Sequence, residues 1–97
     1  MNTVTATAVS AKLTIENAAG LHARPAALFV QTAANFKATI RVRNLTRGTP
    51  FVDAKSILGV MTIGVKKGHD IEVEAVGEDA EEAVQSLTEL VNNNFGE

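Results

Sequence analysis

The sequence places a histidine, an arginine and a proline close together, where a loop gives way to a helical pattern. His22 follows Gly20, and Arg24 and Pro25 begin a run rich in Ala, Leu, Phe and Val. The first N–H groups of a helix have no partner inside it, and with the helix dipole they attract anions. A histidine nitrogen at that boundary is a nucleophile, and the Arg24 guanidinium can donate two hydrogen bonds to phosphate oxygens. The stretch therefore suits phosphoryl transfer, which needs chiefly positioning and charge stabilisation.

The same residues have a simpler interpretation. A histidine at a helix start commonly caps the helix or lies on the surface, and Arg24 would then be a solvated charge. A short motif becomes a site only when its structural context is established. The local sequence leaves both interpretations open.

A second stretch, residues 54–61, places Ser56 at the start of a short apolar helix. Serine is a good N-cap, and the local sequence favours that role alone. The functional alternative is a phosphorylation switch, because a phosphate of about two negative charges would spoil a neighbouring apolar docking surface. So short a helix cannot bury all three of its apolar residues, Ile57, Leu58 and Met61. For each of them, a place in an exposed patch and a place in the core are equally supported by the sequence.

Other candidates for chemistry are weaker. His69 lies in a Gly-containing turn before a strand, and we expect it to be exposed. Two histidines without any cysteine make no metal signature, so we expect neither metal nor cofactor. Three acidic residues alternate along a strand and are expected to form its solvent face: Asp70, Glu72 and Glu74. Three basic residues cluster around a hairpin: Arg41, Arg43 and Arg47.

Composition limits the class of protein. The 97 residues suffice for one domain, and 45% hydrophobic with 21% charged residues is typical of a soluble globular chain. A net charge of -2 and four aromatic residues, all Phe, argue against nucleic acid as a partner. The absence of cysteine fits a cytoplasmic location. No apolar run approaches a membrane span, so membrane insertion is not expected. Residues 1–10 lack the features of a signal peptide and are expected to form a flexible tail before a domain at 11–97, although their alternation could let part of them extend the first strand.

Hydrophobic periodicity predicts the order β-α-β-β-α-β-α. Strands are expected at 12–16, 37–43, 49–53 and 70–75, and helices at 23–34, at 55–62 and after Asp79. Pro50 favours an edge position for the third strand. Asp79 and Glu82 have the spacing of a capping box. The buried stripe of the last helix is expected to comprise Ala80, Ala83, Val84, Leu87, Leu90 and Val91. The economical arrangement is an α+β fold of two layers, a mostly antiparallel four-stranded sheet with three helices on one face.

Two stretches resemble the signatures of one family. Residues 20–26, Gly-Leu-His-Ala-Arg-Pro-Ala, resemble the active-site signature of HPr, the histidine-containing phosphocarrier of the bacterial phosphoenolpyruvate-dependent sugar phosphotransferase system. Residues 55–61, Lys-Ser-Ile-Leu-Gly-Val-Met, resemble the regulatory serine signature of the same family. Both occur in the family's order, and the resemblance covers residues 11–91. The predicted element order is also similar to the family's open-faced β-sandwich.

The resemblance implies a carrier rather than an enzyme. His22 would accept phosphate on Nδ1 from phosphorylated enzyme I and donate it to enzyme IIA-type proteins, and Arg24 would help to bind the phosphoryl group. Ser56 would be the target of an HPr kinase/phosphorylase, its phosphate would weaken enzyme I docking, and a transcription regulator is a further implied partner. The partner-facing patch would comprise Ala23, Ile57, Leu58 and Met61.

Two departures from the family pattern leave partner preference open. The hairpin at 43–50 is longer than usual, and the N-terminal segment is extended. The C-terminal residues 95–97 resemble members of nitrogen-related or regulatory phosphorelays. The alternatives are therefore a carrier in such a relay, or a regulatory module acting through Ser56; a small hydrolase using His22 lacks a readable acid–base partner. A monomer is expected, because a shuttle must dissociate quickly.

Overall fold

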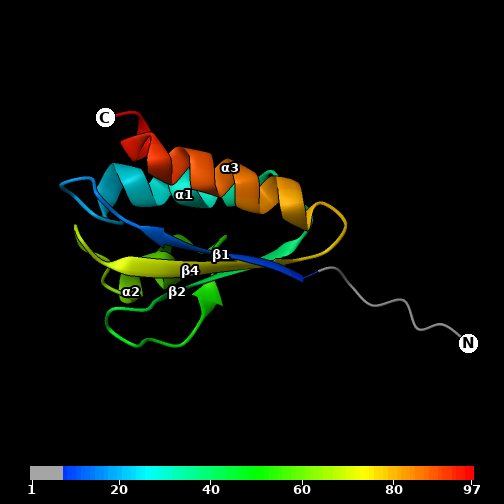
Figure 1. Ribbon diagram of the computed structural model, residues 1–97, viewed down its shortest axis with the longest axis horizontal. Helices are drawn as coiled ribbons and strands as arrows, with labels where there is room; N and C mark the ends of the chain where they lie inside the picture. Colours follow the sequence, from blue (N-terminus) through cyan, green and yellow to red (C-terminus); the bar gives the residue numbers. More distant parts are fainter. Residues whose placement is uncertain (1–7) are drawn as a thin grey trace, which may run out of the picture.

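The strands pair into one antiparallel sheet that two long helices cover. The computed structural model describes residues 8–97, in the order β1 (Ala8–Thr14), α1 (Ala23–Ala34), β2 (Thr39–Asn44), β3 (Val52–Asp53), α2 (Ile57–Thr62), β4 (Asp70–Val76), α3 (Ala80–Asn92) and a 3-10 turn, η1 (Asn94–Gly96). The sheet order is β1-β4-β2-β3, and every pair is antiparallel. Figure 1 shows α1 and α3 lying across one face, while α2 packs beside α1 and β3. The predicted α+β class and element order are confirmed.

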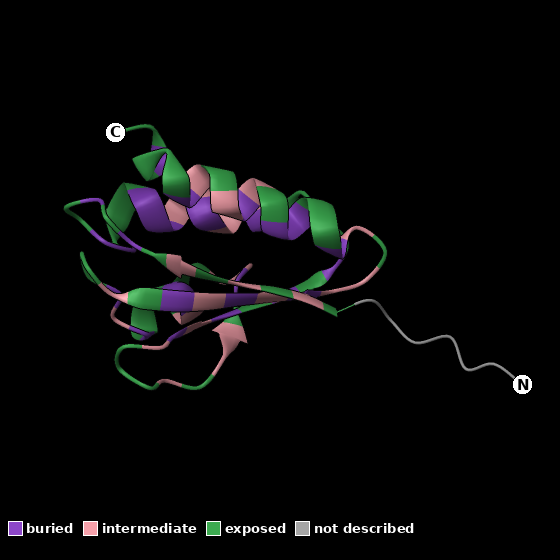
Figure 2. Ribbon diagram, in the orientation of Figure 1, coloured by how far each residue is buried: buried purple, intermediate pink, exposed green. Residues whose placement is uncertain are grey.

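The core lies between the sheet and the two long helices. Alternate residues of β2 and β4, among them Ile40, Val42, Ile71 and Val73, are buried in the same core cluster as Phe29 of α1. Figure 2 shows the buried residues of α1 and α3 turned toward the sheet. The predicted stripe of α3 is buried apart from one member that is only partly buried, Leu90. Burying one such side chain contributes about 1.5–3 kcal/mol to the free energy of folding, so the interface between the sheet and the helices supplies most of the stability.

Several predicted boundaries need correction. β1 begins at Ala8, so residues 8–10 of the predicted tail belong to the sheet; residues 1–7 lie outside the described part of the chain. β3 spans two residues instead of five, because Thr49 turns back to bond Asn44 and Pro50 has no N–H to donate. It is an edge strand, as Pro50 predicted. α2 begins at Ile57, because Ser56 is its cap.

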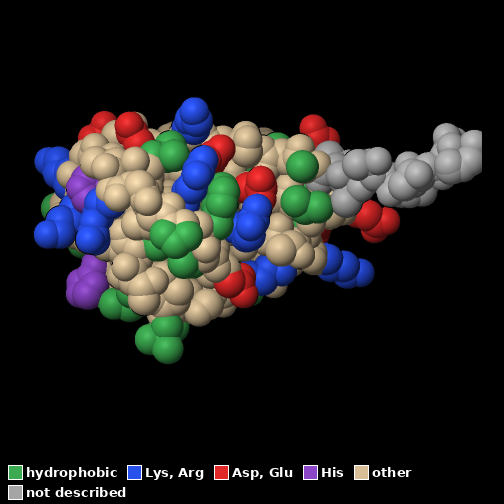
Figure 3. Space-filling view, turned by 90° about the horizontal axis from the view of Figure 1, so that it is seen from below, with side chains coloured by type: hydrophobic (Ala, Val, Ile, Leu, Met, Phe, Trp, Pro, Cys, Tyr) green, Lys and Arg blue, Asp and Glu red, His purple; other side chains and the backbone are tan. Residues whose placement is uncertain are grey.

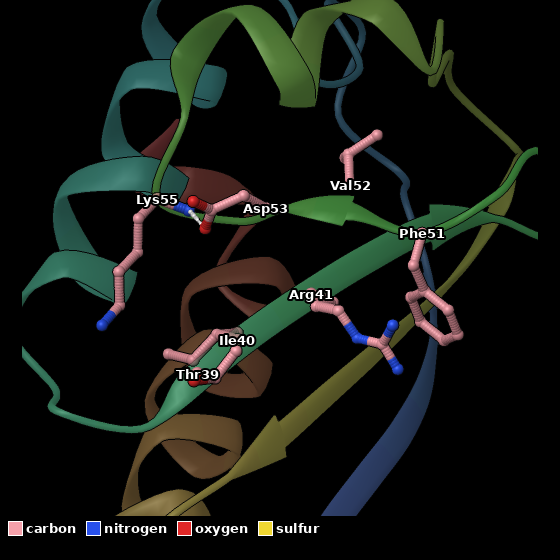
Figure 4. A pocket seen from close by; sticks show the side chains of 7 residues that line it. All are labelled: Thr39, Ile40, Arg41, Phe51, Val52, Asp53 and Lys55. Atoms are coloured by element: carbon pink, nitrogen blue, oxygen red, sulfur yellow. Dashed lines mark hydrogen bonds between the residues drawn. The ribbon is translucent and has the colours of Figure 1, made fainter.

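The outer face of the sheet pairs its charges across strands. Arg41 and Arg43 of β2 form ion pairs with Glu74 and Glu72 of β4. Both guanidinium groups also lie over the Phe51 ring, 4.5 and 4.7 Å from its centroid. Figure 4 shows Arg41 and Phe51 side by side in the pocket beside β3. The predicted acidic face of β4 and much of the predicted basic cluster thus neutralise one another.

The capping box predicted for α3 is wrong. Asp79 occupies the N-cap position, but its side chain makes no cap hydrogen bond. Its carboxylate instead accepts the backbone N–H groups of Lys37 and Ala38, each over 2.8 Å. The hydrogen bond from Lys37 is the main reason that the pKa of Asp79 lies below its ordinary value of 3.8. Asp79 therefore ties the start of α3 to the segment that leads into β2, and β2 begins at Thr39 rather than at 37.

This contact predicts acid sensitivity. A lowered pKa contributes stability that is present above pH 3.8 and is lost as the pH falls through the folded-state pKa. We expect Asp79→Asn to lower the thermal midpoint at pH 7, and the gap from the wild type to close below pH 3.8. Thermal unfolding followed by circular dichroism at several pH values measures this. Glu78→Gln, a matched change at the exposed neighbour, should shift the midpoint little; an equal shift in both variants would contradict the assignment.

Candidate functional site

His22 lies exposed at the N-terminus of α1. It is the N-cap residue, with φ -137° and ψ 154°, and its side chain makes no cap hydrogen bond. The first turn contains no acidic residue. The positive end of the helix dipole therefore faces solvent beside an imidazole whose ring nitrogens do not serve the fold. This arrangement could hold an anion next to a nucleophilic nitrogen.

The segment before His22 is fixed by its own turn and by a neighbouring one. Asn17 Nδ2 donates to the carbonyl of Gly20 over 2.9 Å, and the N–H of Gly20 donates to the carbonyl of Asn17 over 3.1 Å. The N–H of buried Leu21 donates to the carbonyl of Val65 over 3.0 Å. The sequence revealed only a loop here; the one available signal was an Asn three residues before a Gly, a common turn pairing.

Ala23, directly after His22, has a strained backbone. Its φ is +50°, in the left-handed region that costs a residue with a Cβ about 1–2 kcal/mol. Such strain persists only where the surroundings impose it, and it gathers at functional sites. Ala23 is exposed, so neither its side chain nor that of His22 blocks approach to the helix start.

Arg24 is close to the chain's C-terminal residue. Its Nη1 lies 3.9 Å from Oε2 of Glu97, with the two side chains 66% and 38% exposed. A contact this long and this exposed contributes little energy, so the guanidinium can turn toward an anion at His22. Glu97 is placed here by Phe95, which is buried with φ +57° and anchors the last turn. Sequence reasoning missed this contact, because the packing of Phe95 follows no helical period.

A groove connects His22 with α2 and with the turn before β4. Lys66 and Lys67 in that turn are exposed and add positive charge. Figure 3 shows Lys and Arg side chains gathered at the end of the molecule that carries the histidines. The groove is lined by Ala18, Ala19, Leu21, His22, Met61, Gly64, Val65, Lys66 and Lys67.

Ser56 and the apolar residues of α2 lie where the sequence predicted. Ser56 Oγ accepts the N–H of Gly59 over 3.1 Å, which confirms the predicted N-cap. Ile57, Leu58 and Met61 are 41%, 75% and 36% exposed, so they form a surface patch rather than core. Met61 also lines the groove of His22, which joins the patch to the histidine.

His69 is not exposed as predicted; it is half-buried. Its Nδ1 accepts the N–H of Lys66 over 3.1 Å and lies 3.1 Å from Nδ2 of the fully buried Asn44. The turn that suggested a solvated side chain folds back over the ring. The local sequence gave no sign of the contact between His69 and Asn44, because it joins segments 25 residues apart.

Two further observations concern residues 8–97. No group of three or more His, Cys, Asp or Glu side chains there could hold a metal ion. No helix in that range has the length and apolar character needed to cross a bilayer.

The close approach of Gly20 to Val65 predicts an asymmetric response to alanine. Gly20 has φ +63°, and a Cβ there would lie 2.3 Å from the Val65 carbonyl oxygen. Gly48 has φ +69° with nothing within 4 Å. We expect Gly20→Ala to lower the free energy of unfolding by about 3 kcal/mol, from backbone strain and overlap, and Gly48→Ala by about 1 kcal/mol from strain alone. Urea unfolding measures both; equal losses would refute the contact.

Comparison with known proteins places this site in a family. The family described as "PTS HPr component phosphorylation site" matches residues 9–93. Phosphocarrier protein HPr of Neisseria meningitidis is 45% identical over 86% of this chain and 90% of its own length. The multiphosphoryl transfer protein of Haemophilus influenzae is 42% identical over 93% of this chain, which spans only 18% of that relative.

The fold agrees with this match. The crystal structure of HPr from Thermoanaerobacter tengcongensis superposes with a TM-score of 0.87 at 45% identity, covering 92% of this chain and 97% of the other.

Multiphosphoryl transfer proteins are much longer, and the chain spans 18–24% of those compared. The chain belongs to the HPr family of phosphocarrier proteins of the phosphotransferase system.

Proposed function

We propose that this protein accepts a phosphoryl group on His22 from phosphorylated enzyme I and passes it to enzyme IIA-type proteins of a sugar phosphotransferase system. The observation that supports this most is the exposed His22 at the N-terminus of α1, with no capping bond and no acidic residue in the first turn. It lies inside the segment that matches the family. The lone pair of an imidazole placed in this way stays available to attack phosphorus. The positive end of the helix dipole stays available to attract the phosphoryl oxygens.

The transfer step needs little beyond these groups. The lone pair of His22 Nδ1 attacks phosphorus as the bond to the donor nitrogen of enzyme I breaks, and that electron pair returns to the donor ring. The N–H groups of the first turn, which Pro25 reduces by one, stabilise the phosphoryl oxygens. Arg24 turns from Glu97 to donate to them. The group stays at the surface, where the next acceptor can reach it.

The exposed patch supplies the docking surface for successive partners. Ile57, Leu58 and Met61 adjoin the groove of His22, and Ala23 is exposed beside it. A small apolar patch next to exposed cations gives a partner both a contact and an orientation. Both donors and acceptors must use it, because transfer occurs at the same ring.

The carrier role predicts a specific phosphorylated product. Incubation with phosphoenolpyruvate and enzyme I should label the protein with an acid-labile, base-stable phosphate, as a phosphohistidine requires. His22→Ala should abolish the label without unfolding the protein, because the exposed imidazole makes no cap hydrogen bond. Intact-mass spectrometry before and after acid treatment measures it. Label retained in His22→Ala would disprove the assignment of the accepting residue.

Ser56 forms the second part of the proposal, as the target of an HPr kinase/phosphorylase that uses ATP. Its hydroxyl caps α2, and Ile57 and Leu58 follow it on the exposed surface. A phosphate here satisfies the helix start but places about two negative charges at the edge of the docking patch. Phosphorylation would therefore weaken enzyme I docking without disturbing α2.

A charge mimic tests this switch. We expect Ser56→Asp to raise the Kd for enzyme I about tenfold, since Asp retains the cap but adds charge beside the patch. Gln85→Glu adds the same charge on the exposed face of α3 and should leave the Kd unchanged. Titration calorimetry compares the two. An unchanged Kd in Ser56→Asp would refute the electrostatic switch.

A cytoplasmic location and a monomeric state complete the proposal. The chain contains no cysteine, which fits a reducing compartment. A shuttle that exchanges partners at one surface needs that surface free and each complex short-lived.

A further inference from the structure

A polar pair, the buried Asn44 and the half-buried His69, holds the turn at 63–69. Asn44 is fully buried, and its Nδ2 lies 3.1 Å from His69 Nδ1. The same amide donates to the carbonyl of Ile63 over 3.0 Å. A buried amide that lost these partners would cost the fold about 1–3 kcal/mol. The function proposed for His22 makes no use of this pair.

Two donors converge on one ring nitrogen of His69. The backbone N–H of Lys66 donates to Nδ1 over 3.1 Å. The orientation of the Asn44 amide is also determined, because its Oδ1 accepts the N–H of Arg47 over 3.1 Å and Nδ2 must then face His69. Nδ1 is therefore an unprotonated acceptor, and the neutral ring carries its proton on Nε2.

The turn held by this pair is also bonded to the segment before His22. The carbonyl of Val65 accepts the N–H of Leu21, and the backbone of Gly20 lies directly against it. Movement of the turn would move both the carbonyl that anchors Leu21 and the groove wall opposite His22. The polar pair and the imidazole of His22 are thus connected through Val65.

We propose that His69 is a positioning residue for phosphoryl transfer. Its unprotonated Nδ1 holds the turn at 63–69, and Val65 in that turn holds the segment that carries His22. This inference rests on the carrier function proposed above. Transfer in line between two rings tolerates little displacement, and a misplacement of about 1 Å can cost about a hundredfold in rate. By accepting these hydrogen bonds, Nδ1 of His69 keeps the groove wall at Val65 in a fixed position relative to the ring of His22.

Two substitutions separate the acceptor from the bulk of the ring. His69→Leu fills a similar volume without any acceptor. His69→Asn is smaller but can place an amide oxygen near the position of Nδ1. We expect His69→Leu to lower kcat/KM for transfer from phosphorylated enzyme I about tenfold, and to speed exchange of the Leu21 amide hydrogen by a similar factor. His69→Asn should stay within about twofold of the wild type in both, which a role in packing alone would not produce.

Three measurements decide the proposal. Nitrogen-15 NMR of the wild-type ring should show Nδ1 unprotonated and Nε2 protonated at neutral pH, and the reverse would overturn it whether or not His69→Leu folds. Unchanged Leu21 exchange or unchanged transfer in a folded His69→Leu would also overturn it, as would an Asn variant no better than the Leu variant. If the wild type accepts no phosphate, the carrier function fails; the ring spectrum and Leu21 exchange then still decide whether His69 holds the turn.

Discussion

The site depends on one backbone contact, the hydrogen bond from Leu21 N–H to the carbonyl of Val65. The pairing of β1 with β4 makes it possible, because antiparallel strands bring the residue after one strand beside the residue before the other. Thr14 lies opposite Asp70 at that end of the sheet, and Ile15 exchanges backbone hydrogen bonds with Gly68 and His69 in the turn before β4. His22 is therefore held at the end of the sheet, outside the core that stabilises the domain.

Much of the fold could be predicted, because its signals are local. Strand alternation, the stripe on α3 and the Ser56 cap each depend on residues within a few positions. The rest depends on partners remote in sequence: Asp79 bonds the backbone of Lys37, 42 residues away, and His69 faces Asn44, 25 residues away. Local patterns predicted a capping box and an exposed turn histidine. Both were wrong because of contacts with remote segments. Asp79 accepts backbone N–H groups from the segment before β2, and His69 lies against the buried amide of Asn44 as well as the nearby N–H of Lys66.

At the candidate site the sequence indicated the reactive groups but not what holds them. His22 and Arg24 could be singled out because a nucleophile and a cation at a helix start suit an anion, but only the resemblance of residues 20–26 to a family signature favoured that interpretation over a capping or surface role. The strain at Ala23, the contact between Arg24 and Glu97, and the packing of Gly20 on Val65 are products of the folded chain. A carrier needs its nucleophile exposed yet held in place, so the restraints must come from backbone contacts behind the ring.

The net charge of -2 hides an uneven distribution. Glutamates neutralise Arg41 and Arg43 on the outer face of the sheet. In contrast, Lys66 and Lys67 lie exposed on the groove of His22, and the exposed Arg24 beside His22 makes only a long contact with Glu97. On the carrier function proposed for His22, a phosphoryl group would bring about two negative charges and largely cancel that local excess. The surface offered to a donor would then be positive, and the surface offered to an acceptor nearly neutral. The same few side chains would in this way favour release from the donor once transfer is complete, without any change in backbone conformation.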